Sequence, residues 1–203
     1  MGLFLGLNGV VGGEIKSVRT VLAEYGTEHS GFMRPATPAE DEATRLVIAS
    51  GRTGPTILYP GEFLEWEHAG EFLSIRLGKP VFSFHIHDGD LWMFQLYVAG
   101  RAVTAFNTIP DYWGDLPEGE AAFMRGDAAV LARHVPHLAA GDVERYFVPR
   151  KLDEDEPGKA YPDDEFSMGE DWQLVDFMRK LGFVYPLDEK GEPLGECHSF
   201  RAD

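Results

Sequence analysis

The stretch that decides the fold is VFSFHIHDGDLWMFQLYVAGRAVTAFN, residues 81–107. Its apolar runs have the length of β-strands and are separated by Asp88-Gly89 and by Ala99-Gly100. Asp-Gly between two apolar runs is a strong signal for a tight β-hairpin, because both residues tolerate the positive φ that such a turn requires. The stretch therefore predicts a three-stranded antiparallel meander.

The turn decides on which face of the meander each side chain lies. If Asp-Gly forms a two-residue turn, His87 pairs with Asp90 and His85 pairs with Trp92. Side chains alternate between the two faces of a strand, so these four residues share one face. A second two-residue turn then brings Asn107 opposite Trp92. We therefore predict a polar face that gathers both histidines and one carboxylate.

This polar face has the residue types of a divalent-metal site, because imidazole and carboxylate suit zinc, iron, manganese and nickel. We predict His85, His87 and Asp90 as the ligands, with Asp88 or Asp111 orienting a ligand or acting as a general base. However, H-x-H is a common pattern, and the sequence lacks further histidines at the spacing of metallohydrolase signatures. The alternative is a half-exposed polar sheet face that ends in a turn, and the sequence favours this alternative.

The sequence before the meander predicts strands and two amphipathic helices. Strands are expected at 2–11, 44–50 and 56–59, where β-branched and leucine residues are bounded by turn residues. Helices are expected at 13–26 and 61–78, where apolar residues recur at helical spacing. Gly26 is expected to end the first of these helices.

After Trp113 the pattern changes from strands to helices. Short helices are expected over 118–125, 126–135 and 141–148. The clearest helix is expected over 170–182, which has an apolar stripe, a basic pair in its last turn and a final glycine.

Hairpin-connected strands followed by helices predict an α+β fold with a mostly antiparallel sheet, rather than a doubly wound parallel sheet. We expect both groups of helices to pack on the sheet. One domain is predicted over residues 1–186, sheet-rich over 1–114 and helix-rich over 115–186. Residues 27–42, which contain two prolines, are predicted to form a loop, and residues 187–203 a polar, flexible tail.

The charge of the chain restricts its partners. The 34 acidic residues outnumber the 18 Lys and Arg, which gives a formal net charge of −16 over 203 residues. Such a surface repels nucleic-acid phosphates and anionic lipid, so we expect neither as a partner. A basic protein or bound cations suit this charge better. The single cysteine excludes an internal disulfide, and the N-terminus lacks the basic region of a secretory signal, so the sequence predicts a cytoplasmic protein.

Two segments combine aromatic and acidic residues. Residues 110–115 contain Tyr112 and Trp113, and residues 160–166 contain Tyr161. This mixture is typical of protein interfaces and of clefts that bind small ligands, so we predict these aromatic residues as an interaction surface. The alternative is that they fix loops to the sheet. The same acidic region offers four possible calcium ligands without a regular calcium-loop pattern: Asp153, Asp155, Asp163 and Asp164.

No complete catalytic motif occurs in the sequence. We therefore predict a non-catalytic binding protein with a basic protein partner and without a cofactor. The alternative is a metal-dependent, hydrolase-like enzyme that uses the His-x-His-Asp-Gly-Asp hairpin and a divalent metal. A small-molecule sensor is a third possibility, and it requires a pocket between the sheet and the helices.

Overall fold

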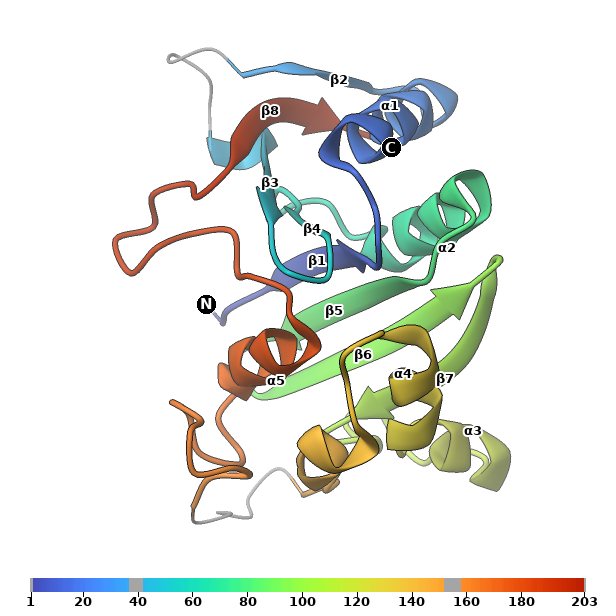
Figure 1. Cartoon of the computed structure of the whole chain (residues 1–203), viewed down its shortest axis with the longest axis vertical. Coiled ribbons are helices and arrows are strands. Elements are labelled where there is room, and N and C mark those ends of the chain that lie inside the picture. Colours follow the sequence, from blue (N-terminus) through green and yellow to red (C-terminus); the bar gives the residue numbers. More distant parts are fainter. Residues whose placement is uncertain (1, 37–41, 152–157, 203) are drawn as a thin grey trace.

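Eight strands form one antiparallel sheet within residues 2–36, 42–151 and 158–202, the part of the chain that the computed structural model describes. The strands are β1 (Leu5–Val10), β2 (Phe32–Pro35), β3 (Arg45–Ser50), β4 (Pro55–Leu58), β5 (Val81–His87), β6 (Leu91–Val98), β7 (Arg101–Asn107) and β8 (Glu196–Arg201). Their order across the sheet is β2-β8-β3-β4-β1-β5-β6-β7. Figure 1 shows β2 and β7 at opposite edges of this sheet.

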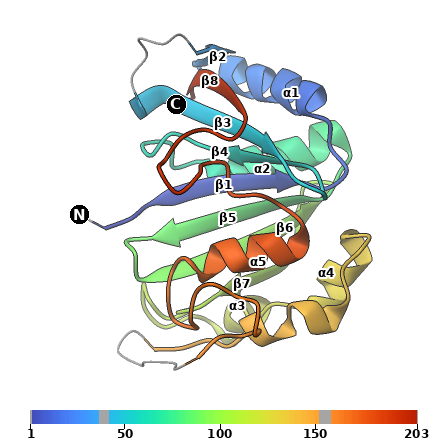
Figure 2. The same ribbon diagram turned by 60° about the vertical axis from the view of Figure 1, so that its left-hand side comes forward.

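Helices cover both faces of the sheet. They are α1 (Ile15–Glu28), α2 (Trp66–Leu77), α3 (Glu118–Phe123), α4 (Ala128–His134) and α5 (Gln173–Leu181). The helices α1 and α2 lie on one face, and α4 and α5 lie on the other (Figure 1, Figure 2). The predicted α+β fold, with two helices in the N-terminal half and a helical C-terminal part, is confirmed.

Each face of the sheet has its own apolar core. Under α1 and α2, Leu22 and Leu73 pack with Phe200, and all three are fully buried or nearly so. Under α5, aromatic residues dominate, and Phe177 of α5 contacts Phe84 and Phe94 of the sheet. Aromatic side chains bury large areas, so this second core holds α5 firmly on β5 and β6.

The meander predicted over residues 81–107 is confirmed as β5, β6 and β7, but its predicted register is wrong. His87 pairs with Leu91, so the loop contains three residues, 88–90, instead of two. Asp88 and Gly89 both have positive φ, as expected, and the amide N–H of Gly89 donates to the carbonyl oxygen of Leu3. The added loop residue moves Trp92 opposite Ile86, onto the face that packs against α5.

The pairing of β6 with β7 also differs from the prediction. The register shifts at Leu96/Tyr97, where β7 accommodates one additional residue. Asn107 therefore lies opposite Met93 and not opposite Trp92. Met93 is itself opposite His85, so Asn107 still lies on the histidine face as predicted, because the longer turn and the bulge offset each other.

The C-terminal residues are part of the sheet. The sequence predicts a flexible tail from residue 187, whereas residues Glu196–Arg201 form β8 between β2 and β3. His198, Ser199 and Phe200 are buried there. The segment has too few apolar residues to be recognised as a strand locally, because its stability comes from pairing with two strands that are distant in the sequence.

Three other local predictions are wrong. Residues 32–35, expected within a loop, form the edge strand β2, and the helix expected over 141–148 is replaced by short 3₁₀ turns at Ala140–Asp142 and Glu144–Tyr146. Gly26 does not end α1, which continues to Glu28. A Cβ at Gly26 would lie 3.0 Å from the carbonyl carbon of Phe32, so the glycine permits close packing of α1 against β2.

In the described ranges, none of the helices combines the length and the apolar composition needed to cross a bilayer.

Candidate functional site

Three segments meet at the end of the sheet where β5 turns into β6. The amide of Gly89 in the turn donates to the carbonyl oxygen of Leu3, at 3.1 Å. The hydroxyl of Tyr112, in the loop after β7, donates to Asp90 Oδ2 at 2.9 Å. The turn is therefore held between the segment that precedes β1 and the loop that follows β7.

His85 is buried at the base of this site, with 3% of its surface exposed. Its Nδ1 lies 2.7 Å from the carbonyl oxygen of Leu5, and its ring stacks on Trp66 of α2 with centroids 4.0 Å apart. Burial lowers the pKa of His85 to about 4; the hydrogen bond to Leu5 acts in the opposite direction but is the smaller effect. His85 is therefore neutral at neutral pH.

His87 lies two residues further along β5 and is half-buried. Its Nδ1 is 3.3 Å from Nε2 of His85. Three rings stand nearly perpendicular to its imidazole: Phe4 at 4.9 Å, Tyr112 at 5.5 Å and Trp113 at 4.9 Å between centroids. We call Phe4, His87, Tyr112 and Trp113 the aromatic cluster. Trp113 is 58% exposed and Phe4 is 39% exposed, so the cluster presents apolar surface to solvent.

Four aspartates lie next to this cluster in the chain or in space: Asp88 and Asp90 belong to the turn, Asp111 directly precedes Tyr112, and the Asp171 carboxylate lies near Gly89. We call Asp88, Asp90, Asp111 and Asp171 the acidic rim. The hydroxyl of Tyr112 donates to Asp90, and this hydrogen bond is the main reason that the pKa of Tyr112 is raised. The pKa of Asp171 is raised chiefly by burial, and the negative charges of Glu170 and Asp90 add to the effect. Carboxylates of the rim are thus close enough to repel one another.

Among the ion pairs that the described residues form with one another, none joins Arg150 to a carboxylate of the acidic rim. Arg150 comes close, but its guanidinium donates to the backbone carbonyl oxygens of Asp90 and Gly169, at 2.5 Å and 2.8 Å. The arginine therefore fixes the backbone of the turn and leaves the Asp90 side chain bonded to Tyr112.

The structure brings only part of the predicted metal site together. His85 and His87 are adjacent, whereas the side chain of Asp90 bonds to Tyr112. Asp88 and Asp111 are exposed. In the part of the chain that is described, no group of three or more His, Cys, Asp or Glu side chains is arranged to hold a metal ion.

The predicted interaction residues fall into two separate places. Tyr112 and Trp113 join His87 in the aromatic cluster, so the metal hypothesis and the interaction hypothesis concern one site. Tyr161 packs on Tyr146 elsewhere, and its hydroxyl donates to the carbonyl oxygen of Gly141 at 2.8 Å. These contacts are those of a residue that fixes a loop.

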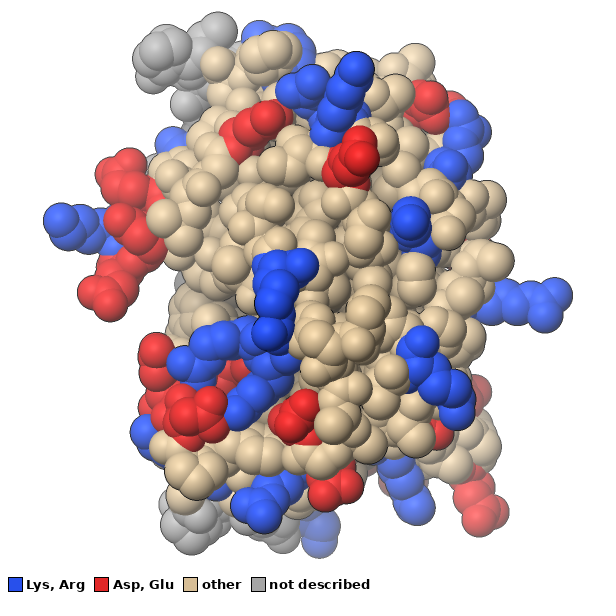
Figure 3. Space-filling model, viewed as in Figure 1, with Lys and Arg blue, Asp and Glu red and all other residues tan. Residues whose placement is uncertain are grey.

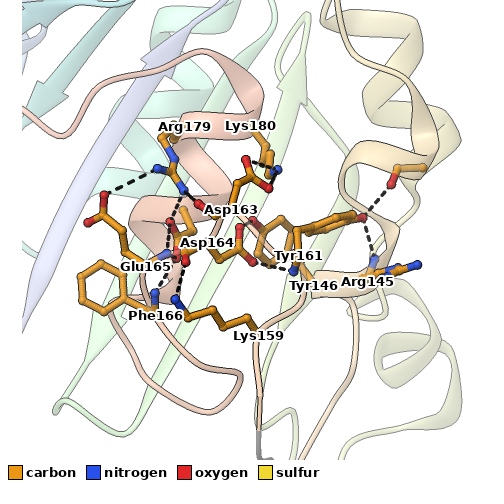
Figure 4. A network of polar contacts seen from close by, with 12 residues as sticks. Arg145, Tyr146, Lys159, Tyr161, Asp163, Asp164, Glu165, Phe166, Arg179 and Lys180 are labelled. Atoms are coloured by element: carbon orange, nitrogen blue, oxygen red, sulfur yellow. Dashed lines mark hydrogen bonds and ion pairs between the residues drawn. The ribbon is translucent and has the colours of Figure 1, made fainter.

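Tyr161 belongs to a polar network that anchors residues 158–170 to α5 (Figure 4). The buried carboxylate of Asp176 accepts hydrogen bonds from the amides of Glu165 and Phe166. The buried carboxylate of Asp164 accepts from the hydroxyl of Tyr146 at 2.6 Å and from the amide of Tyr161. Buried carboxylates with several donors hold a segment in one position, so this network is structural.

The same network accounts for the basic residues of α5. Figure 3 shows Lys and Arg side chains over α5, beside a group of acidic side chains. Lys180 forms an ion pair with Asp163 at 2.6 Å, and Arg179 pairs with Asp176 at 2.6 Å. Of the four predicted calcium ligands, Asp163 and Asp164 are engaged in these contacts, and Asp153 and Asp155 lie outside the described residues.

Three residues of the site could not be foreseen from the sequence. Phe4 and Trp66 contact the histidines of β5 across 83 and 19 positions of the chain, respectively. Asp171, far along the chain, lies near Gly89 of the turn. No local pattern indicates such contacts, since they depend on the pairing of β1 with β5 and on the position of α2.

Comparisons of this chain with protein-family models, with curated proteins and with solved structures found no match. The function must therefore be argued from the site.

Proposed function

We propose that this protein is a binding protein that recognises a basic protein partner through the aromatic cluster and the acidic rim. One observation carries the proposal: Trp113 is 58% exposed, yet it is held against His87 at a turn lined by carboxylates. A side chain that is both exposed and fixed in orientation is suited to serve as an anchor in an interface.

The chemistry of the site favours a cationic ligand group. Tryptophan provides the best aromatic face for an ammonium or guanidinium group, and carboxylates form charge-assisted hydrogen bonds with the same groups. Asp88 and Asp90 act electrostatically on Tyr112 of the cluster, and Asp171 lies close enough to Asp90 to feel its charge. The net charge of −16 would also increase the rate at which a basic partner is encountered.

The test is the affinity for a synthetic arginine-rich peptide, with a glutamate-rich peptide of the same length as the negative probe. We expect the arginine-rich peptide to bind in a salt-sensitive manner and Trp113→Ala to weaken binding about tenfold or more, as loss of an interface anchor does. This substitution leaves the net charge unchanged, so the loss would report on the site and not on non-specific attraction.

Leu194→Ala is the matched control. Leu194 is also 58% exposed, but it precedes β8, on the far side of β1 from the meander in the order of the strands. We expect this variant to bind like the wild type. Equal affinities of wild type and Trp113→Ala would contradict the proposal, and so would an equal loss in both variants.

A metal-dependent enzyme is the second candidate, and one distance favours it. His85 Nε2 and His87 Nδ1 are 3.3 Å apart. Two nitrogen ligands of one tetrahedral zinc ion lie about 3.3 Å apart, so the pair has the spacing of a shared ion. Elemental analysis of the purified protein tests this candidate. Near-stoichiometric metal that is lost in His85→Ala/His87→Ala would favour the enzyme, and a metal-free wild type would count against it.

A further inference from the structure

The two histidines of β5 form a directional pair. Nδ1 of His85 lies 2.7 Å from the carbonyl oxygen of Leu5, which can only accept, so this nitrogen must carry the hydrogen and donate. A neutral imidazole has one N–H, and the burial of His85, which is 3% exposed, favours the neutral form. Nε2 of His85 is therefore an acceptor, and Nδ1 of His87, 3.3 Å away, must be the donor.

This arrangement determines the state of the other nitrogen of His87. When His87 is neutral, its hydrogen is on Nδ1, so Nε2 carries a lone pair. The two nitrogens of an imidazole point in divergent directions, so Nε2 faces away from His85. Among the residues that the structure describes, Nε2 of His87 has no hydrogen-bond partner. The acceptor thus lies within the aromatic cluster, beside exposed Trp113 and Phe4.

We propose that Nε2 of His87 is the hydrogen-bond acceptor for a guanidinium or primary ammonium group of the partner, so that the site selects cations that carry N–H donors. This inference rests on the proposed function and adds its chemical specificity. Trp113 contacts the cation through its ring, the carboxylates at the turn neutralise its charge, and His87 recognises its N–H.

The proposal distinguishes two cations of equal charge. A trimethylated lysine keeps the charge and the affinity for aromatic rings, but it has no N–H to donate. The rim carboxylates also accept N–H donors, so the contribution of His87 is the part of the preference for arginine that is lost when its Nε2 is removed. His85 acts here as a positioning residue, because its Nε2 sets the tautomer of His87.

The first experiment is independent of any ligand. Long-range nitrogen-15 NMR of histidine-labelled protein, at a pH where both rings are neutral, reports which nitrogen of each ring carries hydrogen. We expect the Nδ1–H form for both His85 and His87, and loss of that preference at His87 in His85→Phe. Hydrogen on Nε2 of His87 in the wild type would overturn the inference and would leave the proposed function intact.

The second experiment compares two short peptides that differ only in one residue, arginine or trimethyllysine, with the indole N–H of Trp113 as the NMR probe. We expect the arginine peptide to bind about tenfold more tightly, which is the typical effect of one hydrogen bond to a charged group. His87→Leu should reduce the difference to what the rim carboxylates contribute, and His87→Gln, which keeps a side-chain acceptor, should restore part of it. An undiminished difference in His87→Leu would refute the role of His87.

The outcomes separate the two proposals. If both peptides shift the Trp113 signal with equal affinity in the wild type, the role of His87 is refuted and the cation surface stands. If neither peptide perturbs Trp113, the proposed function fails, and the inference fails with it.

Discussion

His85 and His87 stand two residues apart on β5, yet their surroundings differ. His85 is buried beneath the ring of Trp66 and hydrogen-bonded to the backbone of β1. His87 is half-buried and packs against aromatic rings that are partly exposed to solvent. Alternation along a strand places both on one face whatever the register, so this part of the site could be predicted from the sequence.

The burial of His85 predicts a specific pH dependence of stability. Its pKa is about 4 in the folded protein against 6.5 in the unfolded chain, so the unfolded state binds more protons between these values. The contribution of His85 to the free energy of unfolding should be fully present above pH 6.5 and should be lost as the pH falls toward 4. The loss from this group amounts to up to about 3 kcal/mol.

Urea unfolding of the wild type and of His85→Gln, at pH values above and within this window, checks that prediction. The comparison removes the contributions of other titrating groups, which both proteins share. We expect the wild type to lose more stability on acidification than the variant does. The same loss in both proteins would show that His85 does not resist protonation.

The positions of the other site residues could not be predicted correctly from the sequence. Asp90 and Trp92 were assigned to the histidine face because a two-residue turn was assumed, and one more loop residue reverses Trp92. Strand partners depend on turn length, which a dipeptide signal indicates only in part. Contacts of Phe4 and Trp66 with the histidines are non-local, so no sequence pattern could reveal them.

At the scale of elements, α2 carries a glycine that has a packing role. Gly70 is buried in the middle of the helix, where alanine would normally stabilise by about 1 kcal/mol. A Cβ at Gly70 would lie only 2.2 Å from Ser83 Oγ and 3.0 Å from Nδ2 of Asn8. These two side chains are hydrogen-bonded to each other at 2.9 Å, so neither can move without breaking a buried contact.

We therefore expect Gly70→Ala to destabilise the protein by about 1–3 kcal/mol, the usual cost of overpacking. Gly119→Ala is the matched control, because Gly119 lies in α3 and a Cβ there would meet nothing within 4 Å. That variant should be neutral or slightly more stable. Chemical denaturation of both variants decides the matter, and a stabilised Gly70→Ala protein would show that α2 can shift away from the sheet.

The strand β8 supports a second prediction for elements. Phe200 is 1% exposed and packs with Tyr59 and Phe63 under α1 and α2. Phe200→Ala should cost about 3–5 kcal/mol, as large-to-small changes in a core do. Leu194→Ala, at an exposed position shortly before β8, should change stability by less than about 0.5 kcal/mol. Similar small changes in both variants would mean that the C-terminal segment contributes little to the core.

Helices and strands could be predicted where their sequence signals are contiguous in the chain. The meander and α5 were predicted because hydrophobic spacing and their closing Gly residues are contiguous in the sequence; Gly182 indeed has a φ of 82° after α5. The strands β2 and β8 were missed because each is short or polar and is stabilised by a partner far along the chain. Local propensity is a weak guide wherever such pairing dominates.

At the scale of the whole molecule, charge and surface give the functional argument. The acidic residues behind the net charge of −16 are paired differently in two regions of the surface. Over α5, acids and bases pair with each other, and the polar network there fixes a loop. At the turn between β5 and β6, Arg150 donates to the backbone carbonyl oxygens of Asp90 and Gly169, and aromatic surface is exposed beside the acidic rim. A basic partner is complementary to the second region and not to the first.

The most direct test of this account is chemical-shift mapping with the arginine-rich peptide on isotope-labelled, full-length protein. We expect the largest changes at Phe4, His87 and Trp113, with the ion-paired residues Asp163, Arg179 and Lys180 unaffected, and we expect raised salt concentration to reverse the changes. Changes concentrated on those ion-paired residues or spread evenly over the acidic surface would contradict a dedicated cation site at the β5–β6 turn.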